Sequence, residues 1–254
     1  MNNIKIDCVL DAKANLGEGA IWSVKDQILY WVDINRGLLC KYNPENGKNI
    51  AIDFKKPLGC FALKSNLNVI LALTDGFFEF DQNQKTKTLI DSTESNILEN
   101  RFNDGTVDIK GRFYAGTMAI NGSNIGENAK GSLYCLEPSG KVNKTMDGFY
   151  TINGLAFSPD YKTAYVSDSA YWIQTIWAYD YDLDNGIWSN KRTFFDTKNV
   201  AGRPDGGCID AEGCYWMAGV SGWELLRITP QGKVDMTIKM PIEKPTKIAF
   251  GGSK

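Results

Sequence analysis

The stretch Thr151-Ile152-Asn153-Gly154-Leu155-Ala156-Phe157-Ser158-Pro159-Asp160 decides the fold. A polar residue precedes a short apolar strand, and a Ser-Pro-Asp turn follows, in which proline presets the backbone dihedral and aspartate bonds to its own backbone. A second, aromatic strand runs from Ala164 to Asp168. The segment from Glu18 to Asp33 has the same order of residue types and the same separation of 15 positions as Asn153 to Asp168. The chain is therefore predicted to consist of repeats.

Similar units begin at six places along the chain. Their first residues are Glu18, Cys60, Asn103, Asn153, Asp205 and Thr246, which are 42, 43, 50, 52 and 41 positions apart. Strand-rich repeats of about 40–50 residues are typical of β-propeller blades, each a sheet of four strands. Turn sequences such as Asp184-Asn185-Gly186 predict the hairpins between strands, and no segment has the period of an amphipathic helix. We predict an all-β, six-bladed β-propeller that occupies residues 1–254 as a single domain.

The sixth and third units each have a particular feature of length. The sixth opens at Pro245-Thr246 and the sequence stops at Lys254, whereas a blade needs roughly 30 more residues for its other strands. The last blade is therefore expected to be incomplete, with its C-terminal closing strands missing or truncated. The third unit is longer because it contains Gly122-Ser123-Asn124-Ile125-Gly126, interpreted as a flexible insertion over the channel mouth.

Composition narrows the class of protein. The formal net charge is −2 and Lys or Arg never occur more than two in a row, which argues against a nucleic-acid partner. No apolar run approaches the ~18 residues of a membrane helix, and no signal peptide follows Met1, so we expect a cytoplasmic protein without a membrane partner. The 6 cysteines form no C-x-x-C pair and are expected to be reduced thiols. Composition does not predict the oligomeric state.

The chain contains no histidine. This absence excludes a Ser-His-Asp triad, a Cys-His dyad, a histidine-ligated zinc ion and a histidine general base. Any proton transfer in a catalytic site must therefore use another group, and a carboxylate is the best remaining acceptor.

The repeat brings distant polar residues to one place. In a propeller the innermost strand of every blade starts at the same end of the central channel. The first polar residues of four units are therefore expected to converge there, namely Glu18, Asn103, Asn153 and Asp205. Two nearby carboxylates repel each other unless a cation or protons intervene, and an all-oxygen cluster suits a hard divalent ion such as Ca²⁺, Mg²⁺ or Mn²⁺. The alternative is that these residues only cap strand ends.

Short motifs also run in a characteristic order along the chain. They are Leu16-Gly17-Glu18-Gly19, Asn100-Arg101-Phe102-Asn103-Asp104-Gly105, Gly111-Arg112-Phe113-Tyr114-Ala115-Gly116-Thr117-Met118, Asn153-Gly154-Leu155-Ala156-Phe157-Ser158-Pro159-Asp160, Gly202-Arg203-Pro204-Asp205-Gly206 and Pro245-Thr246. Together they resemble the motifs of the SMP-30/gluconolactonase/LRE family of six-bladed propellers. The resemblance implies a divalent metal held by Glu18, Asn153 and Asp205, a substrate contacted by Arg101 and Asn103, and hydrolysis of sugar-acid lactones.

A lactone is a cyclic ester, and its hydrolysis needs a polarised carbonyl, a nucleophilic water and a place for the oxyanion. We expect one divalent cation (calcium, or magnesium, manganese, zinc or iron), with Asp205 as the candidate catalytic base as well as a metal ligand. Asn103 is expected to orient the water or a sugar hydroxyl, and Arg101 to hydrogen-bond to ring hydroxyls or the oxyanion. Two alternatives stay open: hydrolysis of another ester, such as an organophosphate or a non-sugar lactone, and a calcium-binding propeller scaffold without catalysis.

Overall fold

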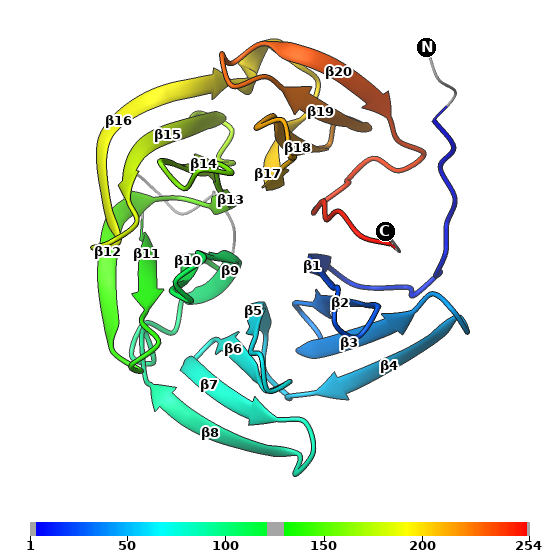
Figure 1. Cartoon of the computed structure of the whole chain (residues 1–254), viewed down its shortest axis with the longest axis vertical. Coiled ribbons are helices and arrows are strands. Elements are labelled where there is room, and N and C mark those ends of the chain that lie inside the picture. Colours follow the sequence, from blue (N-terminus) through cyan, green and yellow to red (C-terminus); the bar gives the residue numbers. More distant parts are fainter. Residues whose placement is uncertain (1–3, 121–129, 253–254) are drawn as a thin grey trace.

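The computed structural model describes residues 4–120 and 130–252. Within these ranges, twenty strands form five antiparallel sheets of four strands each, arranged in a ring around a central axis (Figure 1). The insertion predicted at residues 122–126 lies outside the described residues.

Each sheet is one propeller blade and comes from one continuous segment, with its first strand nearest the axis (Figure 1). Blade 1 consists of β1 (Gly17–Ser23), β2 (Ile28–Asp33), β3 (Leu38–Asn43) and β4 (Lys48–Asp53). Blade 2 consists of β5 (Leu58–Leu63), β6 (Val69–Leu73), β7 (Gly76–Asp81) and β8 (Thr86–Asp91). Blade 3 consists of β9 (Asn100–Val107), β10 (Phe113–Ala119), β11 (Gly131–Leu136) and β12 (Val142–Phe149).

The remaining two blades follow in the same way. Blade 4 consists of β13 (Ile152–Phe157), β14 (Thr163–Asp168), β15 (Thr175–Asp182) and β16 (Ile187–Asp196). A short 3₁₀ helix, η2 (Thr197–Asn199), leads to blade 5, which consists of β17 (Arg203–Ile209), β18 (Tyr215–Val220), β19 (Glu224–Ile228) and β20 (Val234–Lys239).

The predicted all-β propeller is confirmed, but the prediction of six blades is wrong, because the structure contains five. Residues 240–252 run past β17 and β1 without forming a strand (Figure 1). The Gly206 amide donates a hydrogen bond to the carbonyl of Thr246 (2.7 Å), and the Thr246 hydroxyl donates one to the carbonyl of Gly17 (2.6 Å). A blade requires strands that pair with each other over several residues. The segment therefore has the place of an inner strand without the sheet that a sixth blade requires.

The equivalence of the units that begin at Glu18 and Asn153 is visible in their hydrogen bonds. The carboxylate of Asp33, at the end of β2, accepts hydrogen bonds from two backbone amides of the loop that enters β1, at 2.8 and 3.1 Å. The carboxylate of Asp168, at the end of β14, accepts two from the loop that enters β13, at 2.7 and 3.1 Å. In blades 1 and 4, the aspartate at the end of the second strand thus fixes the path of the chain into the inner strand.

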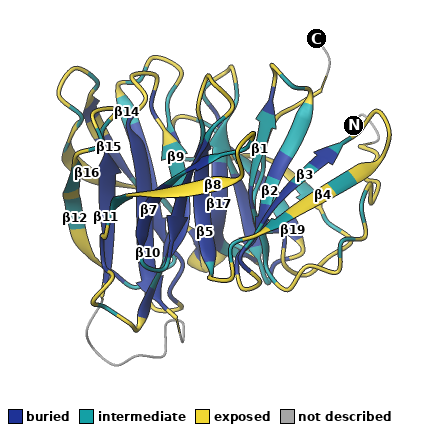
Figure 2. Ribbon diagram, turned by 90° about the horizontal axis from the view of Figure 1, so that it is seen from below, coloured by how far each residue is buried: buried dark blue, intermediate teal, exposed yellow. Residues whose placement is uncertain are grey.

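Apolar side chains fill the spaces between neighbouring blades. Four clusters join blade 1 to 2, 2 to 3, 3 to 4 and 4 to 5, around fully buried aromatic residues such as Phe61, Phe102, Tyr114 and Tyr215. Strands β6 and β10 are buried along their whole length, whereas the outer strands β8 and β20 are mostly exposed. Figure 2 shows the contrast between the buried β10 and the exposed β8. Burial of apolar area between the sheets is the main stabilising contribution in this arrangement.

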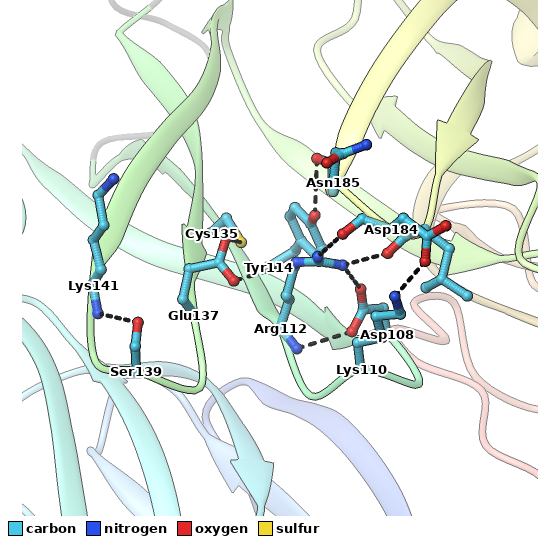
Figure 3. A network of polar contacts seen from close by, with 12 residues as sticks. Asp108, Lys110, Arg112, Tyr114, Cys135, Glu137, Ser139, Lys141, Asp184 and Asn185 are labelled. Atoms are coloured by element: carbon cyan, nitrogen blue, oxygen red, sulfur yellow. Dashed lines mark hydrogen bonds and ion pairs between the residues drawn. The ribbon is translucent and has the colours of Figure 1, made fainter.

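A polar network also ties blade 3 to blade 4 (Figure 3). The guanidinium of Arg112 donates to the carboxylate of Asp108 (2.9 Å) and to the backbone carbonyls of Leu183 and Asp184, both at 2.8 Å. The hydroxyl of Tyr181 donates to the same Asp108 oxygen at 2.6 Å. Since the Asp108 side chain is fully buried, these bonds are what makes its charge tolerable between the blades.

Two simpler expectations concern thiols and membranes. All six cysteines are free thiols, as predicted. Among the described residues, none of the helical structure is long and apolar enough to cross a membrane.

Candidate active site

The inner strands are interrupted near the ring face at which they begin. The pairing of β1 with β2 shifts register just after Glu18, that of β13 with β14 just after Asn153, and that of β17 with β18 between Pro204 and Gly207. A β-bulge of this kind bends the strand and re-aims the side chain beside it. The predicted site residues on β1, β13 and β17 therefore all lie beside bulges.

Glycine makes the bulge in β13 possible. Gly154 has a φ of +63°, which is in the left-handed region that side chains disfavour. A Cβ atom at this position would also lie 2.1 Å from the hydroxyl oxygen of Tyr215. That hydroxyl donates to the Gly154 carbonyl at 2.7 Å, so blade 5 supports the bulge that orients Asn153.

Three of the predicted residues are joined in one hydrogen-bonded chain. Arg101 Nη1 donates to Asn103 Oδ1 at 2.6 Å. Asn103 Nδ2 donates to Asn153 Oδ1 at 2.8 Å and to the carbonyl of Ile152 at 2.9 Å. Asn153 Nδ2 in turn donates to Ser169 Oγ at 2.8 Å. Both asparagines are buried, so these bonds hold β9 against β13 and fix the orientation of both amides.

The two predicted carboxylates interact electrostatically across the axis. Burial raises the pKa of Asp205 well above its ordinary value, and the charges of Glu18 and Asp104 raise it further. Burial, followed by the charge of Asp104, raises the pKa of Glu18 to about 7. Within the described part of the chain, the Asp205 carboxylate receives no hydrogen bond, and Glu18 receives one from the amide of Gly19 (2.9 Å). The ionised forms of these two groups are therefore incompletely compensated by the protein alone.

These residues suit a cation that prefers oxygen ligands. Glu18 and Asp205 offer anionic oxygens, and Asn153 Oδ1 keeps one lone pair after accepting from Asn103. A cation at this point would offset the unfavourable burial and repulsion of the two carboxylates. The described residues contain no group of three His, Cys, Asp or Glu side chains close enough to hold an ion, so such a site depends on the asparagine amide as its third ligand.

A buried ion pair that we did not predict lies beside these carboxylates. Lys247 Nζ is 2.8 Å from Asp104 Oδ1, and the two side chains are 9% and 2% exposed. Burial lowers the pKa of Lys247, but the charge of Asp104, the hydrogen bond to it and the charge of Glu18 act in the opposite direction, and the pKa lies above its ordinary value. The signal in the sequence is positional, since Asp104 follows Asn103 and Lys247 follows Thr246, the first residues of their units. Asp104 and Lys247 are thus the second residues of the third and sixth units, and their opposite charges at equivalent positions predict a contact across the axis.

Sequence reasoning also missed the groups that extend the chain of hydrogen bonds onto blade 5. The hydroxyl of Ser169 donates to the carbonyl of Pro204, and Arg203 Nη1 donates to the carbonyl of Ser169 at 2.9 Å. The guanidinium of Arg203 lies 4.0 Å from the centroid of the Tyr171 ring. Ser169 thus links Asn153 on blade 4 to Arg203 at the start of β17.

Fold and site together define a class of protein: a β-propeller with two carboxylates and two asparagine amides grouped where its inner strands begin. The chain belongs to the family described as SMP-30/Gluconolactonase/LRE-like region, whose model matches residues 16–254.

Individual relatives agree with this assignment over nearly the whole chain. Regucalcin from Xenopus laevis is 37% identical over 254 residues, covering 99% of this chain and 84% of the relative. A protein from Pseudomonas putida named 6-deoxy-6-sulfogluconolactonase is 35% identical over 250 residues, covering 98% and 84%. The crystal structure of a calcium-binding protein, regucalcin, from Agrobacterium tumefaciens superimposes with a TM-score of 0.88 at 27% identity, covering 94% of this chain and 79% of that one.

Proposed function

We propose that this protein is a lactonase that hydrolyses a sugar-acid lactone at the cluster of Glu18, Arg101, Asn103, Asn153 and Asp205. The observation that carries the proposal is the pair of incompletely compensated carboxylates beside a fixed pair of asparagine amides. Membership of the family, together with the lactonase name of the Pseudomonas putida relative, supports the reaction class.

One divalent cation would be held by Glu18, Asn153 and Asp205, and it would be calcium, magnesium, manganese, zinc or iron. The calcium-binding regucalcin of Agrobacterium tumefaciens supports a cation in this fold. Such an ion supplies polarisation of the lactone carbonyl and a lower pKa for a water molecule.

The protein's own residues supply the remaining functions. Asp205 accepts a proton from the attacking water, which is consistent with a carboxylate to which no described residue donates a hydrogen bond. The water oxygen bonds to the carbonyl carbon, the ring C–O bond breaks, and the proton passes to the departing ring oxygen, so that the product is a hydroxy acid. Arg101 hydrogen-bonds to the developing oxyanion or to ring hydroxyls, and Asn103 orients the water.

Hydrolysis of a panel of lactones by chelator-treated protein, with each divalent ion added back, tests this function. The panel includes aldonolactones, non-sugar lactones and an organophosphate ester, and acid release is the readout. Activity on aldonolactones that returns with an ion and is lost in Glu18→Gln supports the proposal. Activity restricted to the other esters, or calcium binding in calorimetry without any hydrolysis, contradicts it.

A further inference from the structure

Two arginines in the described part of the chain make no ion pair with a carboxylate. The chain has six arginines, and four of them form ion pairs: Arg36, Arg112, Arg192 and Arg227. The other two are Arg101 on β9 and Arg203 on β17, both at the beginning of an inner strand. The arginines without an ion pair are thus the two beside the candidate active site.

These two guanidinium groups stand at opposite ends of one chain of contacts. Arg101 donates to Asn103, Asn103 to Asn153, and Asn153 to Ser169, whose carbonyl accepts from Arg203 Nη1 at 2.9 Å. The proposed hydrolysis uses Arg101 at the reacting carbonyl. It gives no role to Arg203, which is nevertheless tied to Asn153 through a single residue.

The surroundings of Arg203 fix its position but leave its hydrogen-bonding capacity incompletely used. Its guanidinium lies 4.0 Å from the centroid of the Tyr171 ring, which orients the planar fork. Its Nε is buried and has no acceptor among the described residues. Tyr171 itself is 61% exposed, so this arginine and its aromatic neighbour border the solvent.

We propose that Arg203, positioned by Tyr171, binds an anionic substituent of the substrate other than its lactone group. The inference rests on the proposed lactonase function and narrows its substrate class to lactones with a carboxylate, phosphate or sulfonate group. All three present two or more oxygens that match the guanidinium fork. The charge of Arg203 interacts with that of Asp205 without forming an ion pair, and an incompletely paired charge in a partly buried position is costly, so such a substituent supplies the ion pair.

Kinetics on matched substrates test this subsite. Gluconolactone is compared with derivatives that carry a carboxylate, a phosphate or a sulfonate in place of its terminal hydroxymethyl group. The native protein is expected to favour at least one charged derivative in kcat/KM, and the three derivatives identify which anion it takes. In Arg203→Gln the ratio of kcat/KM for that derivative to kcat/KM for gluconolactone should fall about ten- to a hundredfold, as expected for hydrogen bonds to a charged group.

Further variants separate recognition from folding. Arg203→Lys keeps the charge without the fork and should show an intermediate ratio, and Tyr171→Ala, at an exposed position, should lower the ratio about two- to tenfold. Arg192→Gln removes a half-exposed arginine of blade 4 that is paired with Asp180, and it should leave the ratio unchanged. Native protein without a preference for any charged lactone, or an unchanged ratio in Arg203→Gln, overturns the proposal.

A binding experiment decides the inference even if no lactone is hydrolysed, which would end the proposed function. Calorimetry measures the affinity of the native protein and of Arg203→Gln for gluconate and for its derivatives with a carboxylate, phosphate or sulfonate at the far end. At least tenfold tighter binding of one such derivative, lost in Arg203→Gln, supports the anion subsite independently of catalysis. Equal affinities of the native protein for gluconate and every derivative refute it.

Discussion

Replacing Lys247 by methionine removes the charge that neutralises Asp104 inside the ring. The two groups are 2.8 Å apart, with side chains 9% and 2% exposed, so water cannot take over the role of the lysine. Removing one partner of a buried pair leaves an uncompensated charge and costs about 3–5 kcal/mol. We therefore expect Lys247→Met to lower the free energy of unfolding by about that amount. An exposed pair contributes only about 0–1 kcal/mol.

Urea unfolding followed by tryptophan fluorescence measures this loss, and a double-mutant cycle assigns it to the pair. Asp104→Asn keeps an oxygen that can accept the hydrogen bond that the Leu155 amide now donates to Asp104 (3.2 Å). The double variant Asp104→Asn with Lys247→Met contains neither charge of the pair. Its loss in the free energy of unfolding should be smaller than the sum of the losses of the two single variants by about 1–3 kcal/mol.

Arg192→Gln is the matched control, because the Arg192–Asp180 pair has the same kind of contact at 2.7 Å with side chains 48% and 53% exposed. The free energy of unfolding of Arg192→Gln should be lower than that of the native protein by no more than about 1 kcal/mol. A decrease in the free energy of unfolding of Lys247→Met as small as that of the control would refute the reasoning. So would additive decreases of the two single variants in the double variant.

Three further outcomes are expected. Asp205→Asn should fold with undiminished stability in metal-free buffer, since it relieves repulsion with Glu18, while kcat falls about 10²–10⁴-fold; near-native turnover would rule out a base at this position. Gly154→Ala should lower the free energy of unfolding by about 2–5 kcal/mol, because alanine meets both the left-handed backbone and the Tyr215 hydroxyl. Tyr181→Phe leaves the buried Asp108 carboxylate with one donor fewer and should lower the free energy of unfolding by about 1.5–3 kcal/mol in the same assay. A loss below about 0.5 kcal/mol, the usual size for a neutral surface change, would mean that the hydrogen bond between Tyr181 and Asp108 does not stabilise the blade contact.

The repeat in the sequence predicted the propeller because its residues have local physical roles. The aspartates that close β2 and β14 are 15 positions after Glu18 and Asn153, and each accepts two amides of the loop that enters its inner strand. Such contacts lie within a single blade and recur in another blade with the same residue types. They could therefore be inferred by comparing two segments of the chain.

The number of blades could not be inferred in this way. Thr246 occupies the position of a first residue and contacts both β17 and β1, as the repeat predicts. Counting such starts does not show whether a paired sheet follows, because a sheet requires hydrogen-bonded neighbours as well as a suitable pattern. Residues 240–252 make isolated hydrogen bonds, such as those of Thr246, but they pair with no strand over several residues, so five blades form.

Part of the candidate site could be predicted from the sequence and part could not. The position within the repeat predicted that Asn103, Asn153, Glu18 and Asp205 would converge, and the hydrogen bonds and electrostatic interactions between them agree with that expectation. Their roles in metal binding and catalysis stay predictions. The stacking of Arg203 on Tyr171 depends on the path of a loop after β14, which no repeat specifies.

Each blade comes from a continuous piece of chain, and blades 1, 3, 4 and 5 place Glu18, Asn103, Asn153 and Asp205 where their inner strands begin. None of these four residues belongs to the apolar clusters that hold neighbouring blades together. A substitution at one of these four positions therefore alters the part of the site that one blade supplies and leaves the apolar clusters between the blades intact. In evolution, substrate preference in such a ring can change one blade at a time, each step being tested by selection on an already stable scaffold.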